Sequence, residues 1–182
     1  MTLAPGARIE WLPLETIAYS GCLAQNRLKL SLAEGAEAMG WDVLALGLPA
    51  ADAAFSSGCY RHHLELPSAW LERGQVDAHD QLLLNSPLGF AGKRVLATLW
   101  FAAGSAWPAA KRDVLLDAAR EAAASHPLQA TTGATSPQPQ VVVLRALADR
   151  VEPAMALLVK VRAAWRELAW QLAPNPPRIW KS

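Results

Sequence analysis

Trp70-Leu71-Glu72-Arg73-Gly74 is the stretch from which the fold can first be predicted. Its residues suit a short β-strand, in which successive side chains point to opposite faces of a sheet. Glu72 would then share a face with Trp70, and a carboxylate on an apolar face is costly unless water, a cation or a hydrogen bond receives it. The alternative is that Glu72 and Arg73 are solvated on opposite faces of the strand, and this segment alone does not decide between the two.

Residues 1–108 repeat this alternation of apolar and polar side chains several times. Leu28, Leu30 and Leu32, for example, would lie on one face of a strand with polar residues between them on the other. Pro, Gly and Ser residues that favour turns separate such segments. The strands expected from this pattern cover residues 8–12, 14–19, 28–32, 39–46, 60–66, 69–76 and 94–101. The predicted fold class is therefore mainly β.

A short repeat indicates how these strands are arranged. The sequence Leu3-Ala4-Pro5-Gly6-Ala7 recurs as Leu32-Ala33-Glu34-Gly35-Ala36, and Ser20-Gly21-Cys22 recurs as Ser57-Gly58-Cys59. Self-similarity at such a period is typical of one supersecondary unit that stacks on copies of itself. We therefore predict short strands stacked in a solenoid-like manner. Because the first copy starts close to Met1, we also expect that an N-terminal portion of the sheet is missing from this sequence.

The period of the apolar residues becomes helical after Pro108. We expect a helix at 109–125, a polar mobile loop at 130–140, a strand at 141–147 and a second helix at 153–172, followed by a Pro-rich tail. Residues 77–92 are expected to form turns and a loop. The β-repeat region at 1–108 and the segment at 109–182 together make a predicted single domain of residues 1–182.

The second predicted helix has apolar residues on two sides. A broad stripe would face the core, and a thinner one runs through Met155, Val159 and Trp170. Trp170 either covers the surface of its own domain, as single apolar residues often do, or belongs to a surface that binds a partner. In the tail, Arg178 and Trp180 are candidate anchors for a partner.

Composition argues against several classes of function. The 182 residues carry 17 basic and 16 acidic side chains, and a net charge of +1 gives no footprint for nucleic acid or anionic lipid. No apolar run is long enough to span a membrane, and the first residues lack a signal-peptide pattern. Cys22 and Cys59 have the spacing of neither a zinc site nor a disulfide scaffold. We therefore expect free thiols and a cytoplasmic protein.

Common catalytic motifs do not occur. The sequence contains no GxSxG, HExxH, Walker A or GxGxxG pattern, so we expect no enzyme activity. His62 and His63 are adjacent, and on a regular strand they would point to opposite faces and could not hold one metal ion as a pair.

Three carboxylates lie on predicted apolar strand faces. Asp42 shares its face with leucines, Glu15 with Ile17, and Glu72 with Trp70. A hydrated interior channel that binds a cation weakly would explain such acids, because hard oxygen ligands release a metal more readily than thiolates do.

Four segments, taken in this order, resemble the UreD family of urease accessory proteins, called UreH in some organisms. They are Trp11-Leu12-Pro13-Leu14-Glu15-Thr16-Ile17, Gly40-Trp41-Asp42-Val43-Leu44-Ala45-Leu46-Gly47, Leu71-Glu72-Arg73-Gly74 and Pro177-Arg178-Ile179-Trp180. The likeness spans nearly all of the chain and begins well inside the usual length of the family. It departs from the family at Leu14, where Gln is common, and the segment at residues 130–140 is expected to be specific to this sequence.

The resemblance implies a mostly β scaffold with two C-terminal helices and no catalytic activity. Such a protein would bind UreF and UreG and dock on the urease apoprotein, so that nickel(II) reaches the urease active site through an internal water-filled passage. No cofactor would be permanently bound. Asp42 and Glu72 fall where the family has acidic residues associated with that passage, and Glu15 lies in a motif where Glu or Asp is usual. These three are the expected nickel contacts.

A second class of function remains open from the residues themselves. The alternative is a non-catalytic β-solenoid interaction module, whose acids are structural and whose second helix docks a partner through Val159 and Trp170. Changing Asp42 or Glu72 to its amide separates the two hypotheses, because only a nickel-conducting scaffold would lose function.

Overall fold

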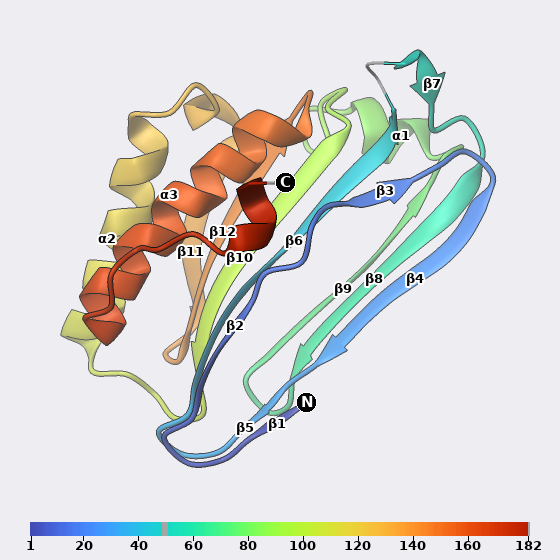
Figure 1. Ribbon diagram of the computed structural model, residues 1–182. Coiled ribbons are helices and arrows are strands. Elements are labelled where there is room, and N and C mark those ends of the chain that lie inside the picture. Colours follow the sequence, from blue (N-terminus) through green and yellow to red (C-terminus); the bar gives the residue numbers. More distant parts are fainter. Residues whose placement is uncertain (49–50, 182) are drawn as a thin grey trace.

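Three layers stack in the computed structural model, which describes residues 1–48 and 51–181 (Figure 1). A long central sheet lies between a smaller sheet and a pair of helices. The strands are β1 (Thr2–Leu3), β2 (Arg8–Trp11), β3 (Thr16–Ala18), β4 (Cys22–Lys29), β5 (Ser31–Leu32), β6 (Glu37–Leu48), β7 (Ala53–Ala54), β8 (Gly58–Leu66), β9 (Trp70–Asp77), β10 (Val95–Ala103), β11 (Thr132–Gln138) and β12 (Val141–Ala148). The helices are α1 (Gln81–Asn85), α2 (Ala109–Ala124) and α3 (Val151–Trp170), with 3-10 turns η2 (Gln129–Thr131) and η3 (Arg178–Lys181).

The central sheet is built on β6 and β10, whose residues are almost all buried. Its strand order is β11-β12-β10-β6-β2, and β3 and β7 also pair with β6. Strand β10 runs antiparallel to β6 and β12, whereas β2 and β3 run parallel to β6. Continuous apolar runs of this kind are typical of strands that are covered on both faces.

Helices α2 and α3 cover one face of the central sheet (Figure 1). Phe101 of β10 packs edge-on against Trp107 and Trp170 on this side. Trp165 of α3 is buried, and its indole donates a hydrogen bond of 2.8 Å to the Leu115 carbonyl of α2. The two helices and this face of the sheet therefore share one apolar core.

The second sheet, in the order β4-β8-β9, covers the other face. Strand β4 is parallel to β8, and β9 is antiparallel to it. Tyr60, His62 and Leu64 of β8 point toward the central sheet, and Arg61 and His63 between them point outward. This period of two leaves the outer face of the second sheet polar and open to solvent.

The two copies of the sequence repeat lie side by side. Leu3 pairs with Leu32 in the parallel pair β1–β5, and Cys22 pairs with Gly58 in the parallel pair β4–β8. The parallel pairing of the two copies continues where β2 and β3 join β6, but within the described residues β9, β10 and β12 join their neighbours in antiparallel pairs and the sheets are open. The predictions of a mainly β fold and of two long C-terminal helices are confirmed, but an extended solenoid is not formed by residues 1–48 and 51–181.

Two predictions of loop structure are wrong. Residues 130–140, expected to be a mobile loop, contain strand β11, which forms because it pairs with β12 although its own sequence is polar. Residues 77–92, expected to be turns and a loop, contain α1, whose Asp80 carboxylate accepts a hydrogen bond of 2.9 Å from the Leu83 N–H. No helix in the described ranges is long and apolar enough to cross a membrane.

Candidate functional site

A layer of polar side chains crosses the space between the two sheets. On the central sheet, Thr98 of β10 pairs directly with Asp42 of β6 and with Arg145 of β12, so these three residues form one row across the sheet. The second sheet contributes the residues that face this row, namely Asn26 of β4, His62 of β8 and Glu72 of β9. Strand pairing alone therefore brings together residues separated by more than a hundred positions in sequence.

This polar layer divides the inter-sheet core into two apolar clusters. One cluster contains Leu64 and Trp100. The other contains Leu44 and Phe90. Placing polar groups in the middle of such a core costs free energy that an apolar residue would not. The layer therefore requires either complete internal hydrogen bonding or a function.

Asp42 lies at the centre of the layer, and only part of the hydrogen-bonding capacity of its carboxylate is used. The Asn26 amide donates a hydrogen bond of 2.9 Å to its Oδ1, and His62 Nδ1 lies 3.2 Å from its Oδ2. The side chains of Asp42 and His62 are 18% and 19% exposed, so both are shielded from bulk water. Neither ring nitrogen of His62 has a partner at hydrogen-bonding geometry within the described residues. The imidazole therefore has unused donor or ligand capacity.

Glu72 marks the other end of the layer. Its carboxylate forms an ion pair with Arg145 of the central sheet. The Glu72 side chain is 19% exposed, similar to that of Asp42, whereas the Arg145 side chain is 43% exposed. The arginine of this pair is therefore the part that lies closest to solvent. The expectation that Asp42 and Glu72 point into the interior rather than to the outer surface agrees with these positions.

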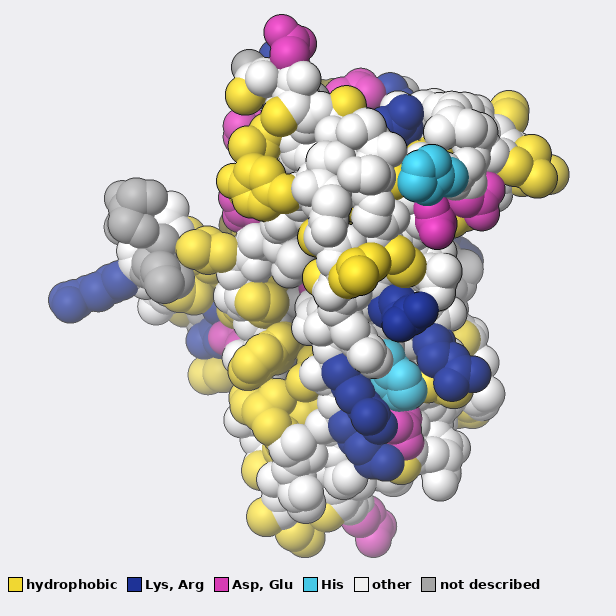
Figure 2. Space-filling model, turned by 90° about the vertical axis from the view of Figure 1, so that its right-hand side faces the viewer, with side chains coloured by type: hydrophobic (Ala, Val, Ile, Leu, Met, Phe, Trp, Pro, Cys, Tyr) yellow, Lys and Arg dark blue, Asp and Glu magenta, His cyan; other side chains and the backbone are white. Residues whose placement is uncertain are grey.

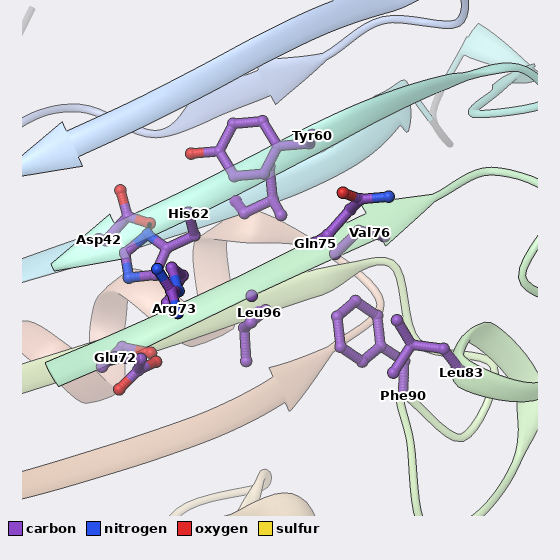
Figure 3. Close-up of a pocket in the computed structure, with 13 residues that line it drawn as sticks. Asp42, Tyr60, His62, Glu72, Arg73, Gln75, Val76, Leu83, Phe90 and Leu96 are labelled. Atoms are coloured by element: carbon purple, nitrogen blue, oxygen red, sulfur yellow. Dashed lines mark ion pairs between the residues drawn. The ribbon is translucent and has the colours of Figure 1, made fainter.

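Both acids line one cavity of about 200 Å³ (Figure 3). Asp42, His62 and Glu72 gather at one end of it, and Leu83 and Phe90 lie at the other. A second, smaller cavity of about 40 Å³ is lined by Asp42 and His62 together with residues that include Asn26 and Trp100. The Asp42–His62 pair therefore belongs to the walls of both cavities.

Burial and the Asp42 carboxylate together shift the pKa values of Tyr60 and His62. Burial raises the pKa of Tyr60 to about 12, with a further contribution from the charge of Asp42. Burial by itself would lower the pKa of His62, but the Asp42 carboxylate, helped by the charge of Glu72, raises it above its ordinary value overall. The Asp42–His62 pair therefore favours the protonated imidazole.

Asp42→Asn should lower the pKa of His62 to below its ordinary value near 6.5. The substitution removes the carboxylate that pairs with the ring and leaves the burial that favours the neutral ring. An NMR titration of the imidazole protons measures the shift. Glu72→Gln should produce a smaller decrease, because Glu72 acts only through its charge. An unchanged His62 titration in Asp42→Asn would contradict the assignment of Asp42 as its partner.

The donor set suits a passing cation better than a resident one. Within residues 1–48 and 51–181, no cluster of three or more His, Cys, Asp or Glu side chains is arranged to hold a metal ion. Asp42 and His62 offer one oxygen and one nitrogen ligand, fewer than the four protein ligands of a structural zinc site. An ion between them would keep much of its water, and it would leave easily.

Comparison with known proteins identifies the family to which the chain belongs. The family described as "UreD urease accessory protein" matches residues 1–181. The chain belongs to the UreD family. It is 57% identical over 180 residues to the urease accessory protein UreD of Polaromonas sp. (strain JS666 / ATCC BAA-500) and 58% identical over 180 residues to that of Verminephrobacter eiseniae (strain EF01-2). In each case 99% of this chain aligns with 65% of the relative, so the chain spans less than two thirds of their length.

The structure of this UreD-family chain does not bring Glu15 to the other two acids. Glu15 lies between β2 and β3, is partly exposed, and lines neither of the cavities that Asp42 shares with His62. Its role as a nickel contact stays a prediction, but it would have to act outside the layer formed by Asp42 and Glu72.

Trp170 is not part of an exposed stripe in this UreD-family chain. Its side chain is only 5% exposed, and its indole donates a hydrogen bond of 2.8 Å to Glu37 Oε2. Of the two alternatives for Trp170, the structure agrees with packing against its own domain, because Trp170 belongs to the core that α3 shares with the central sheet. Val159 is partly buried and packs against the same core. A Trp170→Asp variant would therefore report on folding rather than on partner binding.

In the tail, the Trp180 side chain packs against the domain, whereas the Arg178 side chain is exposed. The Trp180 ring stacks on Trp41 with 5.0 Å between ring centres, and the Arg162 guanidinium lies 5.2 Å from the Trp180 ring centre. Arg162 also donates to the Asn175 carbonyl at 3.1 Å. Trp180 therefore anchors the tail to its own chain, and partner binding by Arg178 stays a prediction.

Sequence reasoning missed most of the polar layer. The sequence pattern addresses His62 only as a neighbour of His63, and it does not distinguish Asn26, Thr98 or Arg145 from other polar strand residues. Their polarity within apolar strands was a visible signal, as it was for Asp42. What was missing is the pairing of sheets that turns separate polar residues into one layer.

Proposed function

We propose that this chain acts as a non-catalytic scaffold in urease maturation, through which nickel(II) passes to the urease apoprotein within a complex that also contains UreF and UreG. The family membership supports a role as a urease accessory protein. The observation that carries the nickel part of the proposal is the polar layer in which Asp42, His62 and Glu72 line one cavity between the sheets. The cytoplasm is the proposed location, and nickel is cargo rather than a resident cofactor.

The ligand types of the layer suit nickel in transit. Imidazole is a good ligand for nickel, whereas carboxylates bind divalent cations of many kinds. An ion at the Asp42–His62 pair would meet one ligand of each type. Few protein ligands mean weak binding, and weak binding allows the ion to leave for a site with more ligands.

The Glu72–Arg145 ion pair has a defined place in this proposal. While no cation is present, the arginine neutralises Glu72 and provides a partner for this partly buried carboxylate. A divalent cation that reaches Glu72 would compete with the guanidinium. Because Arg145 is 43% exposed, it can move into solvent at little cost when that exchange occurs.

A genetic test decides whether the chain works in urease maturation. The gene that contains this chain, supplied to a urease-producing bacterium from which its own UreD gene has been deleted, should restore urease activity and the nickel content of purified urease. Metal analysis of the urease is the measurement, with the deletion strain carrying an empty plasmid as the control. Restored activity without restored nickel would contradict nickel delivery, and failure of both despite stable expression would contradict the proposal as a whole.

A further inference from the structure

Basic side chains gather on the outer face of the second sheet, where Figure 2 shows them next to histidine. Each of the three strands of this sheet contributes an arginine. The period of two places Arg27 of β4, Arg61 of β8 and Arg73 of β9 on this face, and all three are exposed. Arg27 pairs with His63, and His63 pairs with Arg73, so these residues form a row across the sheet. Two strand spacings separate the two arginines of the row, which is about 10 Å.

These arginines lack carboxylate partners within the described part of the chain. Arg61 donates a hydrogen bond of 3.0 Å to the Gln75 side chain, and no ion pair is formed by Arg27, Arg61 or Arg73. The carboxylates on the same face are already engaged. Glu65 pairs with Lys29 at 2.9 Å, and Asp77 pairs with His79 at 3.2 Å. Arg61 lies one row away from Arg27 and Arg73 on the neighbouring strands. Charges of one sign at this spacing repel one another, so a counter-charge from outside would stabilise this face.

We propose that this face, the Arg27–Arg61–Arg73 surface, docks an acidic, extended segment of another protein. Guanidinium groups match carboxylates in a planar, two-pronged geometry, which makes three arginines better suited to carboxylates than three lysines would be. Exposed Leu23 and Leu71 stand on the same face and can pack against apolar residues of that segment. In the described ranges β4 and β9 are the edge strands of this sheet, which suits an extended partner.

Charge distribution favours a protein over a nucleic acid or a membrane. Glu65 and Asp77 lie on the same face as the arginines. A continuous phosphate backbone or an anionic bilayer would have to pass these carboxylates, whereas a segment with a few spaced acids would not. The chain as a whole has a net charge of only +1, which is far from the strongly basic character of most nucleic-acid-binding domains.

The docking surface can be separated from the proposed nickel passage. It lies on the face of the second sheet that points away from Asp42, although atoms of Arg27 and Arg73 also contribute to the walls of the two cavities. Arg61 lines neither cavity. Arg61→Gln therefore changes the surface without changing the passage, and docking can fail while nickel delivery succeeds, or the reverse.

Peptide binding to the 182-residue chain tests the proposal. The probe is a short fluorescein-labelled peptide of alternating Glu and Thr, and its counterpart with Gln in place of Glu is the neutral control. Fluorescence anisotropy at low ionic strength should show binding of the acidic peptide that weakens as salt shortens the Debye length to about 8 Å at 0.15 M. The neutral peptide should bind at least about tenfold more weakly, because it offers no carboxylate to the arginines.

A pair of charge-matched variants locates the binding. The triple change Arg27→Gln, Arg61→Gln and Arg73→Gln should weaken binding about tenfold, and Arg61→Gln alone up to about fivefold. The control carries Arg112→Gln, Arg120→Gln and Arg150→Gln, which have the same effect on net charge but lie on or beside the helices. It should bind within about twofold of the parent chain, because removal of distant, screened charges has little effect.

Four results would overturn the proposal. They are no binding of the acidic peptide by the parent chain, equal losses in the two triple variants, no loss in Arg61→Gln, and tighter binding of a single-stranded oligonucleotide or of phosphatidylserine vesicles than of the peptide. Far-UV circular dichroism confirms that each variant is folded. If the triple variant is not, Arg61→Gln decides alone, since it replaces one exposed side chain.

Discussion

Glu37→Leu is expected to lower the free energy of unfolding by about 3 to 5 kcal/mol. The Glu37 carboxylate is buried at the start of β6, where it accepts hydrogen bonds from the indoles of Trp107 at 2.9 Å and Trp170 at 2.8 Å. Lys111 donates to it at 2.6 Å. Leucine would leave two buried indole N–H groups without an acceptor, and each such group costs about 1 to 3 kcal/mol. Urea unfolding followed by circular dichroism measures the change.

Glu37→Gln is the matched control, because it keeps the shape and one acceptor oxygen. It should cost less than Glu37→Leu while removing the negative charge. An equal loss of stability in the two variants would show that the charge, rather than the hydrogen bonding, holds this contact. A negligible loss in Glu37→Leu would contradict the structural role of Glu37 altogether.

The pH dependence of the free energy of unfolding provides a second test of the role of Glu37. Burial raises the pKa of Glu37, but the hydrogen bonds from Lys111, Trp107 and Trp170 more than offset this, so that the pKa is lowered overall. A carboxyl group with a lowered folded-state pKa contributes stability above its unfolded value of about 4.3 and loses it as the pH falls through the folded-state pKa. The parent chain should therefore lose stability faster than Glu37→Gln below about pH 4.3.

Much of the fold could be predicted from local pattern. Alternation located most of β6, β8 and β9, and the helical period located α2 and α3, because these elements bury one side or both sides of a regular structure. The prediction of one strand at 28–32 was wrong, because β4 ends at Lys29 and β5 begins at Ser31. Strand β11 was missed because its polar sequence does not encode a strand by itself, and pairing with β12 supplies the missing stabilisation. Helix α1 was missed because Asp80, taken as a turn residue, is a helix cap.

The site was predictable only in part for a related reason. Asp42 and Glu72 could be found because a carboxylate among apolar strand residues is locally conspicuous. Their partners could not be assigned, because which strand faces which across two sheets is a property of the whole fold. The same holds for the arginine surface, where Arg27, Arg61 and Arg73 are far apart in sequence and gather only through strand pairing. The distribution of charges along the sequence therefore does not indicate this arginine surface.

The double variant Asp42→Asn with Glu72→Gln should lower the nickel content of urease at least about tenfold. Both changes keep side-chain shape and remove charge from the cavity that the two residues line. A unit charge about 4 Å from a cation contributes about 4 kcal/mol per unit of cation charge at an effective dielectric constant of 20. A tenfold effect needs only about 1.4 kcal/mol. Metal analysis of urease matured in cells that carry the variant is the measurement.

A helix variant with the same change in charge serves as the control. Asp117→Asn with Glu121→Gln removes two exposed carboxylates from α2, far from the polar layer, and should leave the nickel content unchanged. Glu15→Gln, tested separately, shows whether an acid outside the two cavities also takes part. Because Glu72 neutralises Arg145, the double variant also frees a guanidinium near the cavity, and the added repulsion of a cation should strengthen the loss.

Co-purification with the proposed partners separates nickel delivery from assembly of the complex. If the double variant stays in complex with UreF, UreG and urease but delivers little nickel, the acids act on the ion itself. If it stays in complex and delivers nickel normally, the acids are structural, and the interaction-module hypothesis is favoured over the passage. If it leaves the complex, the loss of nickel follows from assembly, and His62 becomes the decisive residue. His62→Leu keeps both carboxylates and removes only the nitrogen ligand, so a loss of nickel in an intact complex would then still identify the Asp42–His62 pair as the point that the ion must pass.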